Sequence, residues 1–332
     1  MLPRRDFLTA LLAPAILPRF AIAAGMQTRR TESVLPIRVL TLNHVSFGCA
    51  DLKATVGWFG RVFGLPVHAF QDYSGGQTVV RVGDNPPSYM ALSQRNKNSI
   101  GQPSNRRPHF CWGAEDFNVD RILRGLSEME APAQAVLREG KTINGVNFDT
   151  PDGFPLQFNP ANACGGGGFL GDVCDAGAKA DRPAGAPPAI AVKTLNNVRM
   201  IVPNLQKSLD WYLKLTDMRA LALPGSTKIL QVGKGPQFIA MSEGNGPEAF
   251  KPHVGFGVHG FNADQVMARL AEHGVTARKN DRNEILLDSP DGIEIGLQDV
   301  SYCACKPGLS ASARPEAWRA TARLAEAQAR RR

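Results

Sequence analysis

The central part of the sequence lacks an excess of charge of one sign. The net charge of the 332 residues is +8, but Arg4, Arg5 and Arg19 against Asp6 supply +2 of it within the first 25 residues. Residues 314–332 supply a further +4, so only +2 is left for everything between. That central part shows no basic stripe with interleaved aromatic residues, which argues against a nucleic-acid partner.

The sequence also lacks an apolar run long enough for a stable membrane insertion. Residues 1–24 begin with a charged head, continue as an Ala/Leu-rich run broken by Pro14 and Pro18, and close on small residues suited to cleavage. The two prolines disfavour the alternative of an amphipathic helix of the mature protein. The pair Arg4-Arg5 followed by Phe7-Leu8 resembles a twin-arginine signal, so we predict export to the periplasm in the folded state.

Two stretches of the sequence match each other in the same order. The offset between the matched positions is 153 residues through the opening strand and the first helix. Several matches in one order over this length indicate a duplication. The matches include Thr41–Val45 with Thr194–Val198, Trp58-Phe59 with Trp211-Tyr212, Pro108–Phe110 with Pro252–Val254, and Thr150–Gly153 with Ser289–Gly292.

The periodicity changes in a fixed order within each copy. A strand with alternating apolar residues comes first, and a helix with apolar residues at helical spacing follows it. Short strands separated by Gly, Pro and Asn come next, and then a strand that begins at His109 or His253. A second helix leads to a final hairpin with a Pro-Asp-Gly turn. Each copy is therefore predicted to contain the order βαβββ twice in abbreviated form, with four strands in each half. Two such half-sheets should curl around a shared cup.

These patterns predict an α+β protein built from two tandem βαβββ modules that form cupped mixed sheets. A linker rich in Gly, Ala and Pro separates the modules, and a basic, Ala-rich tail ends the chain as a solvated terminus. The expected divisions are a signal peptide at 1–24, a first module at 39–163, a linker at 164–191, a second module at 192–302 and a tail at 303–332.

Cysteine is scarce, but its placement is informative. In an oxidising compartment, loop cysteines can pair. Cys164 and Cys174 bracket a glycine-rich loop that a bridge could close, and a bridge between the two module ends is the alternative. The spacings match no common zinc pattern, which disfavours a metal cluster. The four loop cysteines are Cys164, Cys174, Cys303 and Cys305, whereas Cys49 and Cys111 are expected to be buried in strands.

Three motifs carry a resemblance to a known family. They are the opening "LNHV", the helix "DLKATVGWFGRVFGLPV" and the strand entry "DTPDGFPLQF". With the duplication, this ordered set resembles the vicinal oxygen chelate superfamily, which includes glyoxalase I, fosfomycin resistance proteins and extradiol dioxygenases. The resemblance covers both modules. It implies a cup that holds a divalent metal (Fe, Mn, Zn or Ni) with ligands from three strands.

The resemblance places the metal ligands of the first module at His44, His109 and Gln157. Two imidazoles and an amide oxygen can bind such a metal and leave positions open for a bidentate substrate. Gln157 departs from the usual glutamate, so the metal receives no negative charge from the protein. An ordinary strand histidine is the alternative interpretation of His44.

The second module has lost most of the ligand set. Its matching positions are Asn197, His253 and Gly296, and we expect His253 to be a packed or hydrogen-bonded histidine. Glu294 and Gln298 share the strand parity of Gly296, so either could face the cup. Any chemistry is therefore expected in the first module.

Two functions are compatible with these observations. The first is an exported, metal-dependent enzyme that acts on a small oxygen-bearing molecule, as a dioxygenase or a glyoxalase-like lyase or isomerase. The alternative is a metal-free protein that binds and sequesters a small molecule. In both cases the expected partner is a small molecule, with no nucleic acid, and a homodimer is left open as the assembly. No acid or base residue is fixed by spacing alone.

Overall fold

The computed structural model describes residues 33–71, 77–84, 87–95, 108–138, 141–165, 187–222, 227–245 and 253–302. The expected signal peptide and tail, and residues 166–186 of the expected linker, lie outside the described residues. Apart from Ser33, the described residues belong to one compact unit. Within them, the helices are too short or too polar to cross a membrane.

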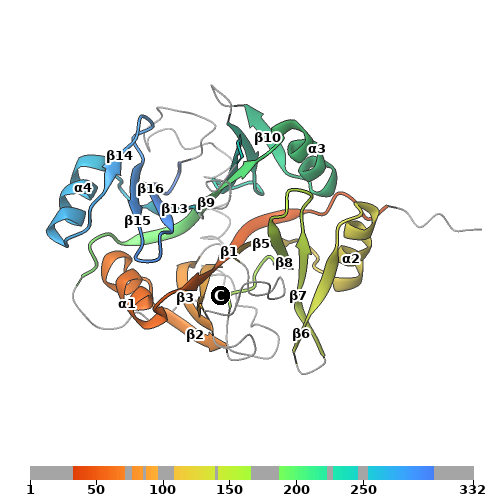
Figure 1. Ribbon diagram of the computed structural model, residues 1–332, viewed down its shortest axis with the longest axis horizontal. Coiled ribbons are helices and arrows are strands. Elements are labelled where there is room, and N and C mark those ends of the chain that lie inside the picture. Colours follow the sequence, from red (N-terminus) through yellow and green to blue (C-terminus); the bar gives the residue numbers. More distant parts are fainter. Residues whose placement is uncertain are drawn as a thin grey trace, which may run out of the picture. The chain divides into compact units, whose positions relative to one another are not determined.

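The first half of the chain forms one eight-stranded mixed sheet (Figure 1). Its strands lie in the order β2-β3-β4-β1-β5-β8-β7-β6, so the first strand of each half, β1 and β5, meet at the centre. The elements are β1 (Val39–Cys49), α1 (Leu52–Phe63), β2 (Val67–Gln71), β3 (Gln77–Asp84), β4 (Pro87–Gln94), β5 (His109–Ala114), α2 (Val119–Glu128), β6 (Ala133–Arg138), β7 (Lys141–Asp149) and β8 (Pro155–Pro160).

The second half repeats this topology. Its sheet has the order β10-β11-β12-β9-β13-β16-β15-β14. The elements are β9 (Val192–Val202), α3 (Leu205–Leu215), β10 (Arg219–Ala222), β11 (Lys228–Gln231), β12 (Phe238–Glu243), β13 (His253–Val258), α4 (Ala263–Glu272), β14 (Arg278–Lys279), β15 (Ile285–Asp288) and β16 (Glu294–Asp299).

Both sheets confirm the predicted fold class. Each contains βαβββ twice, with four strands per half. In the first sheet, β1 runs parallel to β4 and antiparallel to β5, and β5 runs parallel to β8. The second sheet repeats these three relations with β9, β12, β13 and β16. The central strands β1, β5 and β8 are therefore neighbours, and the residues expected at the site lie on them.

The four helices of the described residues begin with the same kind of N-cap. The side chain of an Asp or Asn accepts a hydrogen bond from the backbone N–H three residues later, which satisfies one of the free donors of the first turn. A cap of this kind stabilises a helix by about 1 kcal/mol. The caps are Asp51, Asn118, Asn204 and Asn262. The sequence therefore determines where each of these helices starts, and the duplication preserved these capping residues.

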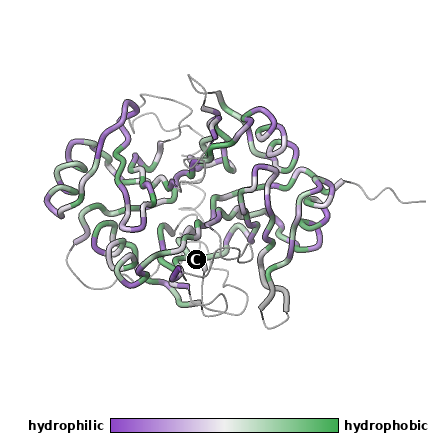
Figure 2. The backbone as a smooth tube through the Cα atoms, viewed as in Figure 1, coloured by the Kyte–Doolittle hydropathy of each residue, from purple (hydrophilic) through white to green (hydrophobic). Residues whose placement is uncertain are grey.

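The two modules share one hydrophobic core. The ring of Phe63 on α1 lies 5.6 Å from that of Phe256 on β13, and the rings of Trp112 on β5 and Tyr212 on α3 are 5.7 Å apart. Green and purple stretches alternate along the chain in Figure 2, as expected when each strand has one apolar and one polar face. The modules are therefore not independent bodies joined by a linker.

The Pro-Asp-Gly turns also join the modules. Asp152, in the turn before β8, accepts a hydrogen bond from Ser208 Oγ on α3 at 2.6 Å. The equivalent Asp291, before β16, accepts one from Thr55 Oγ1 on α1 and another from the backbone N–H of Ala50. Each module thus holds the first helix of the other by the same contact. The turns were predicted, but this reciprocal bonding was not.

Candidate functional site

One face of the first sheet is polar, although its strands are central. Along β1, Val45 and Phe47 point into the shared core, so His44 and Ser46, which alternate with them, point to the opposite face. A register shift between Leu42 and His44 allows Leu42 to belong to the core as well. The same alternation on the neighbouring strands places Tyr89, His109, Cys111 and Gln157 on that face as well. We call it the site face of the first sheet.

The two histidines lie close together on the site face. The rings of His44 and His109 are 5.5 Å apart between centroids and are inclined at 76°. In the register of β1 and β5, His109 pairs with Ser46 and His44 pairs with Cys111, so the histidines are diagonal neighbours. Both are buried, with 4% of His44 and 9% of His109 exposed.

Gln157 completes the predicted set. It pairs with Cys111 across β5 and β8, and its side chain lies near enough to His44 to affect the pKa of that imidazole. Space for the amide is provided by Gly145 on β7, where an added Cβ would lie 2.9 Å from Gln157 Nε2 and 3.1 Å from Asn159 Oδ1. The structure therefore brings His44, His109 and Gln157 together.

Asn43 orients the imidazole of His44. The amide nitrogen of Asn43 donates to the carbonyl oxygen of Ala163 at 2.6 Å, so its Oδ1 is the atom that lies 3.0 Å from His44 Nδ1. An amide oxygen can only accept, and the hydrogen-bond network therefore assigns the proton of the neutral imidazole to Nδ1. The lone pair is then on Nε2. Sequence reasoning missed this contact, although Asn43 belongs to the "LNHV" motif.

The ring of a tyrosine stacks on the imidazole of His44. Tyr89, which pairs with His44 across β4 and β1, stacks on it with 4.4 Å between centroids and 17° between planes. The Tyr89 ring in turn contacts Gly165, where a Cβ would lie 2.7 Å away. Gly165 follows Cys164, which is buried and disulfide-bonded. The chain after β8 thus holds both residues that flank His44.

Burial keeps His44 neutral. The loss of hydration lowers its pKa well below 6.5, the nearby His109 lowers it further, and the side chain of Gln157 opposes the shift. No carboxylate of the described residues contributes to this shift. A neutral imidazole with its lone pair on Nε2 is the form that binds metals.

The matching face of the second sheet is arranged differently. His253 Nδ1 lies 2.9 Å from Glu294 Oε1, so His253 is hydrogen-bonded as predicted. Asn197 donates to Gln298 at 3.1 Å instead of facing an open space. A Cβ at Gly296 would overlap the carboxylate of Glu284, at 2.2 Å from its Oε1. The place of the third ligand is therefore filled by Glu284, the residue that precedes β15.

Arginine and amide groups compensate the two carboxylates of this face. Arg199 lies 3.1 Å from Glu294 and 3.7 Å from Glu284, and Arg278 lies 2.5 Å from Glu294. Gln298 and Asn280 also donate to Glu284. Within the described ranges, no three His, Cys, Asp or Glu side chains could hold a metal ion together. The first site face has only two residues of those types in its set, because the third is a glutamine.

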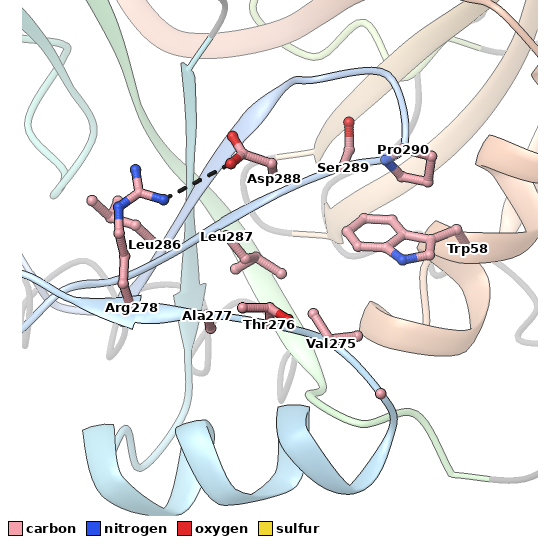
Figure 3. Close-up of a pocket in the computed structure, with 11 residues that line it drawn as sticks. Trp58, Val275, Thr276, Ala277, Arg278, Leu286, Leu287, Asp288, Ser289 and Pro290 are labelled. Carbon is pink, nitrogen blue, oxygen red and sulfur yellow. Dashed lines mark ion pairs between the residues drawn. The ribbon is translucent and has the colours of Figure 1, made fainter.

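Two cavities lined by described residues lie away from the site face of the first sheet. One of about 400 Å³ separates Trp58 on α1 from the β14–β15 edge of the second sheet (Figure 3). Val275, Leu287 and Pro290 line it, and an ion pair of 3.9 Å between Arg278 and Asp288 closes one side. A cavity of about 430 Å³ occupies the equivalent place beside Trp211. Neither includes the histidines of the first site face.

The cysteines divide as expected into two kinds. Cys49 and Cys111 are free and buried, which confirms that prediction. Burial and the nearby Asp291 raise the pKa of the Cys49 thiol to about 12. Cys164 is disulfide-bonded. Cys174, Cys303 and Cys305 lie outside the described residues, so the predicted pairing stays a prediction.

Comparisons with known proteins identify the fold. No family model and no curated protein matches the sequence. Among solved structures, the 2,3-dioxygenase LapB from Pseudomonas sp. KL28 is 13% identical, with a TM-score of 0.57, over 80% of this chain and 94% of that chain. A homoprotocatechuate 2,3-dioxygenase variant from Brevibacterium fuscum is 13% identical, with a TM-score of 0.55, over 82% and 75%. The Mn(II)-bound glyoxalase from Novosphingobium aromaticivorans is 15% identical, with a TM-score of 0.58, over 80% and 84%. The chain has the two-module fold of these proteins.

Proposed function

We propose that the chain is a metal-dependent enzyme whose centre lies on the site face of the first sheet. His44, His109 and Gln157 would hold one divalent ion. The observation that carries this proposal is the meeting of two buried imidazoles and one amide on three central strands, with rings 5.5 Å apart and His44 held neutral by burial. The donor set suits Fe, Mn, Zn or Ni, and it supplies no charge of its own.

The residues around the ligands prepare His44 for this role. Asn43 keeps the proton on Nδ1 and so leaves the lone pair on Nε2, and stacking on Tyr89 fixes the plane of the ring. Gln157 lies in the space over Gly145, close to His44. Such support orients a ligand before the metal arrives. When bound, a divalent ion would supply Lewis acidity to oxygen atoms of a substrate.

The reaction class follows from the fold neighbours and belongs to this proposal. Two neighbours are 2,3-dioxygenases and one is a glyoxalase that contains Mn(II). Three protein ligands leave positions for two substrate oxygens, which both chemistries need. We therefore propose a dioxygenase, or a glyoxalase-like lyase or isomerase, that acts on a small oxygen-bearing molecule.

Export to the periplasm is part of the same proposal. It is supported by the twin-arginine-like residues 4–8 and by the disulfide at Cys164, because disulfides persist in oxidising compartments. Export in the folded state would let the site take up its metal before it crosses the membrane.

Metal analysis of protein purified from the periplasm tests the proposal. We expect one divalent ion per chain in the wild type and none in His44→Ala. The matched control is His253→Ala, which removes the equivalent strand histidine of the second module and should keep the ion. A chain that carries no metal, and that also fails to bind added Fe, Mn, Zn and Ni, would refute the enzyme proposal.

One observation favours a second candidate function. The predicted ligand set contains no carboxylate, so it would hold a divalent ion less tightly than a set that carries negative charge, which favours a ligand bound without a metal. A metal-free binding or sequestering protein would then keep its ligand affinity after treatment with a chelator. Turnover that is lost with the metal and restored by its return would exclude this alternative.

A further inference from the structure

We infer that the second module positions the proposed metal ligand His44 through one side chain, the carboxamide of Gln237. The inference rests on the proposed function and assigns Gln237 as a positioning residue of that site. Gln237 directly precedes β12, its side chain is buried, and 195 residues separate it from its partner Leu42 on β1. The second module therefore does more than complete the shared core.

The carboxamide of Gln237 pairs with both backbone groups of Leu42. Its Oε1 accepts from the Leu42 N–H at 2.9 Å, and its Nε2 donates to the Leu42 carbonyl oxygen at 3.1 Å. The same Nε2 also donates to the carbonyl oxygen of Leu195 on β9, at 2.7 Å. All three hydrogen bonds are buried, so loss of the carboxamide would leave backbone groups unpaired. One side chain thus joins the first strands of the two modules.

The carboxamide takes the place that a neighbouring strand would have beside Leu42. The pairing of β1 with β4 begins at His44 and Tyr89, two residues beyond Leu42. From β4, the hydroxyl of Ser88 donates to the Leu42 carbonyl oxygen at 3.2 Å. The Leu42 N–H is instead paired with Gln237. The second module therefore completes the backbone pairing of β1 just before the proposed ligand.

A β-bulge lies between this anchored residue and His44. In the pairing of β1 with β5, Leu42 faces Trp112 and His44 faces Cys111, so Asn43 is an extra residue in β1. In a regular strand, neighbouring side chains point to opposite faces, and Asn43 could not bond to His44. The bulge allows Asn43 Oδ1 to lie 3.0 Å from His44 Nδ1. The anchor on Leu42 thus fixes the backbone at the start of the bulge that orients His44.

The duplication provides an internal reference for this contact. The connection between β11 and β12 lies against β1, because a Cβ at Gly233 would overlap the carbonyl oxygen of Leu40. The end of β3 lies against β9 in the same way, because a Cβ at Gly83 would be 2.6 Å from the carbonyl oxygen of Lys193. The bulge is also repeated in β9, with Asn196 as its extra residue. The approach of the two backbones is therefore symmetrical.

The side chain that reaches across the modules is not symmetrical. The registers of β1 with β4 and of β9 with β12 make Ser88 the counterpart of Gln237. Each donates to the equivalent carbonyl oxygen of its own module, Leu42 for Ser88 and Leu195 for Gln237. A serine hydroxyl has one proton to give, whereas the longer glutamine has a second proton and an acceptor for Leu42. The additional hydrogen bonds therefore go to β1, the strand that carries His44.

Gln237→Met tests the inference, because methionine has about the same length as glutamine but no N–H donor and only a weak acceptor. We expect the variant of the full chain to bind Mn²⁺ about tenfold more weakly in isothermal titration. In the metal-free chain, NMR should show changed ring-proton shifts of His44, because its imidazole moves relative to the stacked ring of Tyr89. The ring-proton shifts of His253 should stay as in the wild type.

Two further variants separate positioning from general stability. Ser208→Ala removes a different inter-module hydrogen bond, to Asp152, and should leave both the Mn²⁺ affinity and the His44 shifts unchanged. Urea denaturation of each variant shows how much stability it has lost. Gln237→Ser copies the residue of the first module, so it can keep the bond to Leu195 while it loses those to Leu42. It should reproduce the effects of Gln237→Met.

The outcomes for the inference and for the proposed function are distinct. A wild-type chain that binds no Mn²⁺ would refute the proposed function, whereas the His44 shifts are measured without metal and test the positioning by themselves. Wild-type His44 shifts in a folded Gln237→Met or Gln237→Ser chain would overturn the inference. An equal loss of Mn²⁺ affinity in Ser208→Ala would overturn it as well, because Gln237 would then act only through stability.

Discussion

The two sheets have the same topology, but different kinds of side chain occupy their polar faces. The first gathers a second imidazole and a phenol ring around His44, whereas the second gathers two carboxylates and two guanidinium groups around His253. Helix caps, turns and the reciprocal bonds of Asp152 and Asp291 are shared by both modules. Duplication therefore preserved the contacts that hold the scaffold, while the side chains of the two faces diverged.

The largest expected difference between the sheets is in metal binding. His109→Ala should abolish the binding of Mn²⁺, because it leaves a single imidazole on the face. Asn197→Ala, at the position equivalent to His44 in the second sheet, should leave the binding unchanged. Isothermal titration of both variants with Mn²⁺ checks this comparison, and a loss of binding in Asn197→Ala would break it.

Removal of a polar side chain from the second site face should destabilise the protein more than the matched removal from the first. Glu284→Ala removes a buried carboxylate that pairs with Arg199 and accepts hydrogen bonds from Asn280 and Gln298, and it should lower the free energy of unfolding by about 3 kcal/mol. Urea denaturation measures the change. Gln157→Ala, at a half-buried position of the first site face, is the matched variant and should cost less than about 1.5 kcal/mol. Equal losses would show that the second network is not a structural one.

Substitutions at two equivalent asparagines distinguish an effect on the orientation of His44 from an effect on the fold. Asn43→Ala should weaken Mn²⁺ binding about 10–100-fold, because His44 Nδ1 loses its acceptor. Asn196, its counterpart, accepts from Thr194 and donates to the carbonyl oxygen of Asp299, so Asn196→Ala should leave Mn²⁺ binding unchanged. The ¹⁵N shifts of His44 give a second measurement without metal, in which Asn43→Ala should shift the proton toward Nε2.

The smallest effect concerns the contacts that the modules share. Asp152→Ala and Asp291→Ala should each lower the free energy of unfolding by about 1 kcal/mol, because each removes a hydrogen bond to the helix of the other module. Double-mutant cycles with Ser208→Ala and Thr55→Val measure the coupling. Unequal coupling energies would mean that the scaffold has diverged as well as the faces.

Most of the fold could be predicted from local signals. The periodicity of the strands, the Asx caps of the helices and the Pro-Asp-Gly turns are short-range features, and the duplication supplied each of them twice. The short edge strands β2 and β6 carried no clear alternation and were not located. The meeting of His44, His109 and Gln157 followed from the resemblance, because the strands that carry them had known places in that fold.

The supporting contacts could not be predicted, because they depend on register and distant backbone. Asn43 bonds to the carbonyl oxygen of Ala163, 120 residues away. Glu284 fills the space over Gly296 only because β15 and β16 pair so that Leu286 lies beside that glycine. Neither relation leaves a spacing signal in the sequence. The divergence of the two faces therefore became visible only in three dimensions.

The position of a bound ion tests the central claim most directly. Crystals of the Mn²⁺-loaded chain should show one anomalous scattering peak, within coordination distance of His44, His109 and Gln157. A peak beside His253 and Glu284, or the absence of a peak at the first site face, would contradict the assignment of the chemistry to the first sheet.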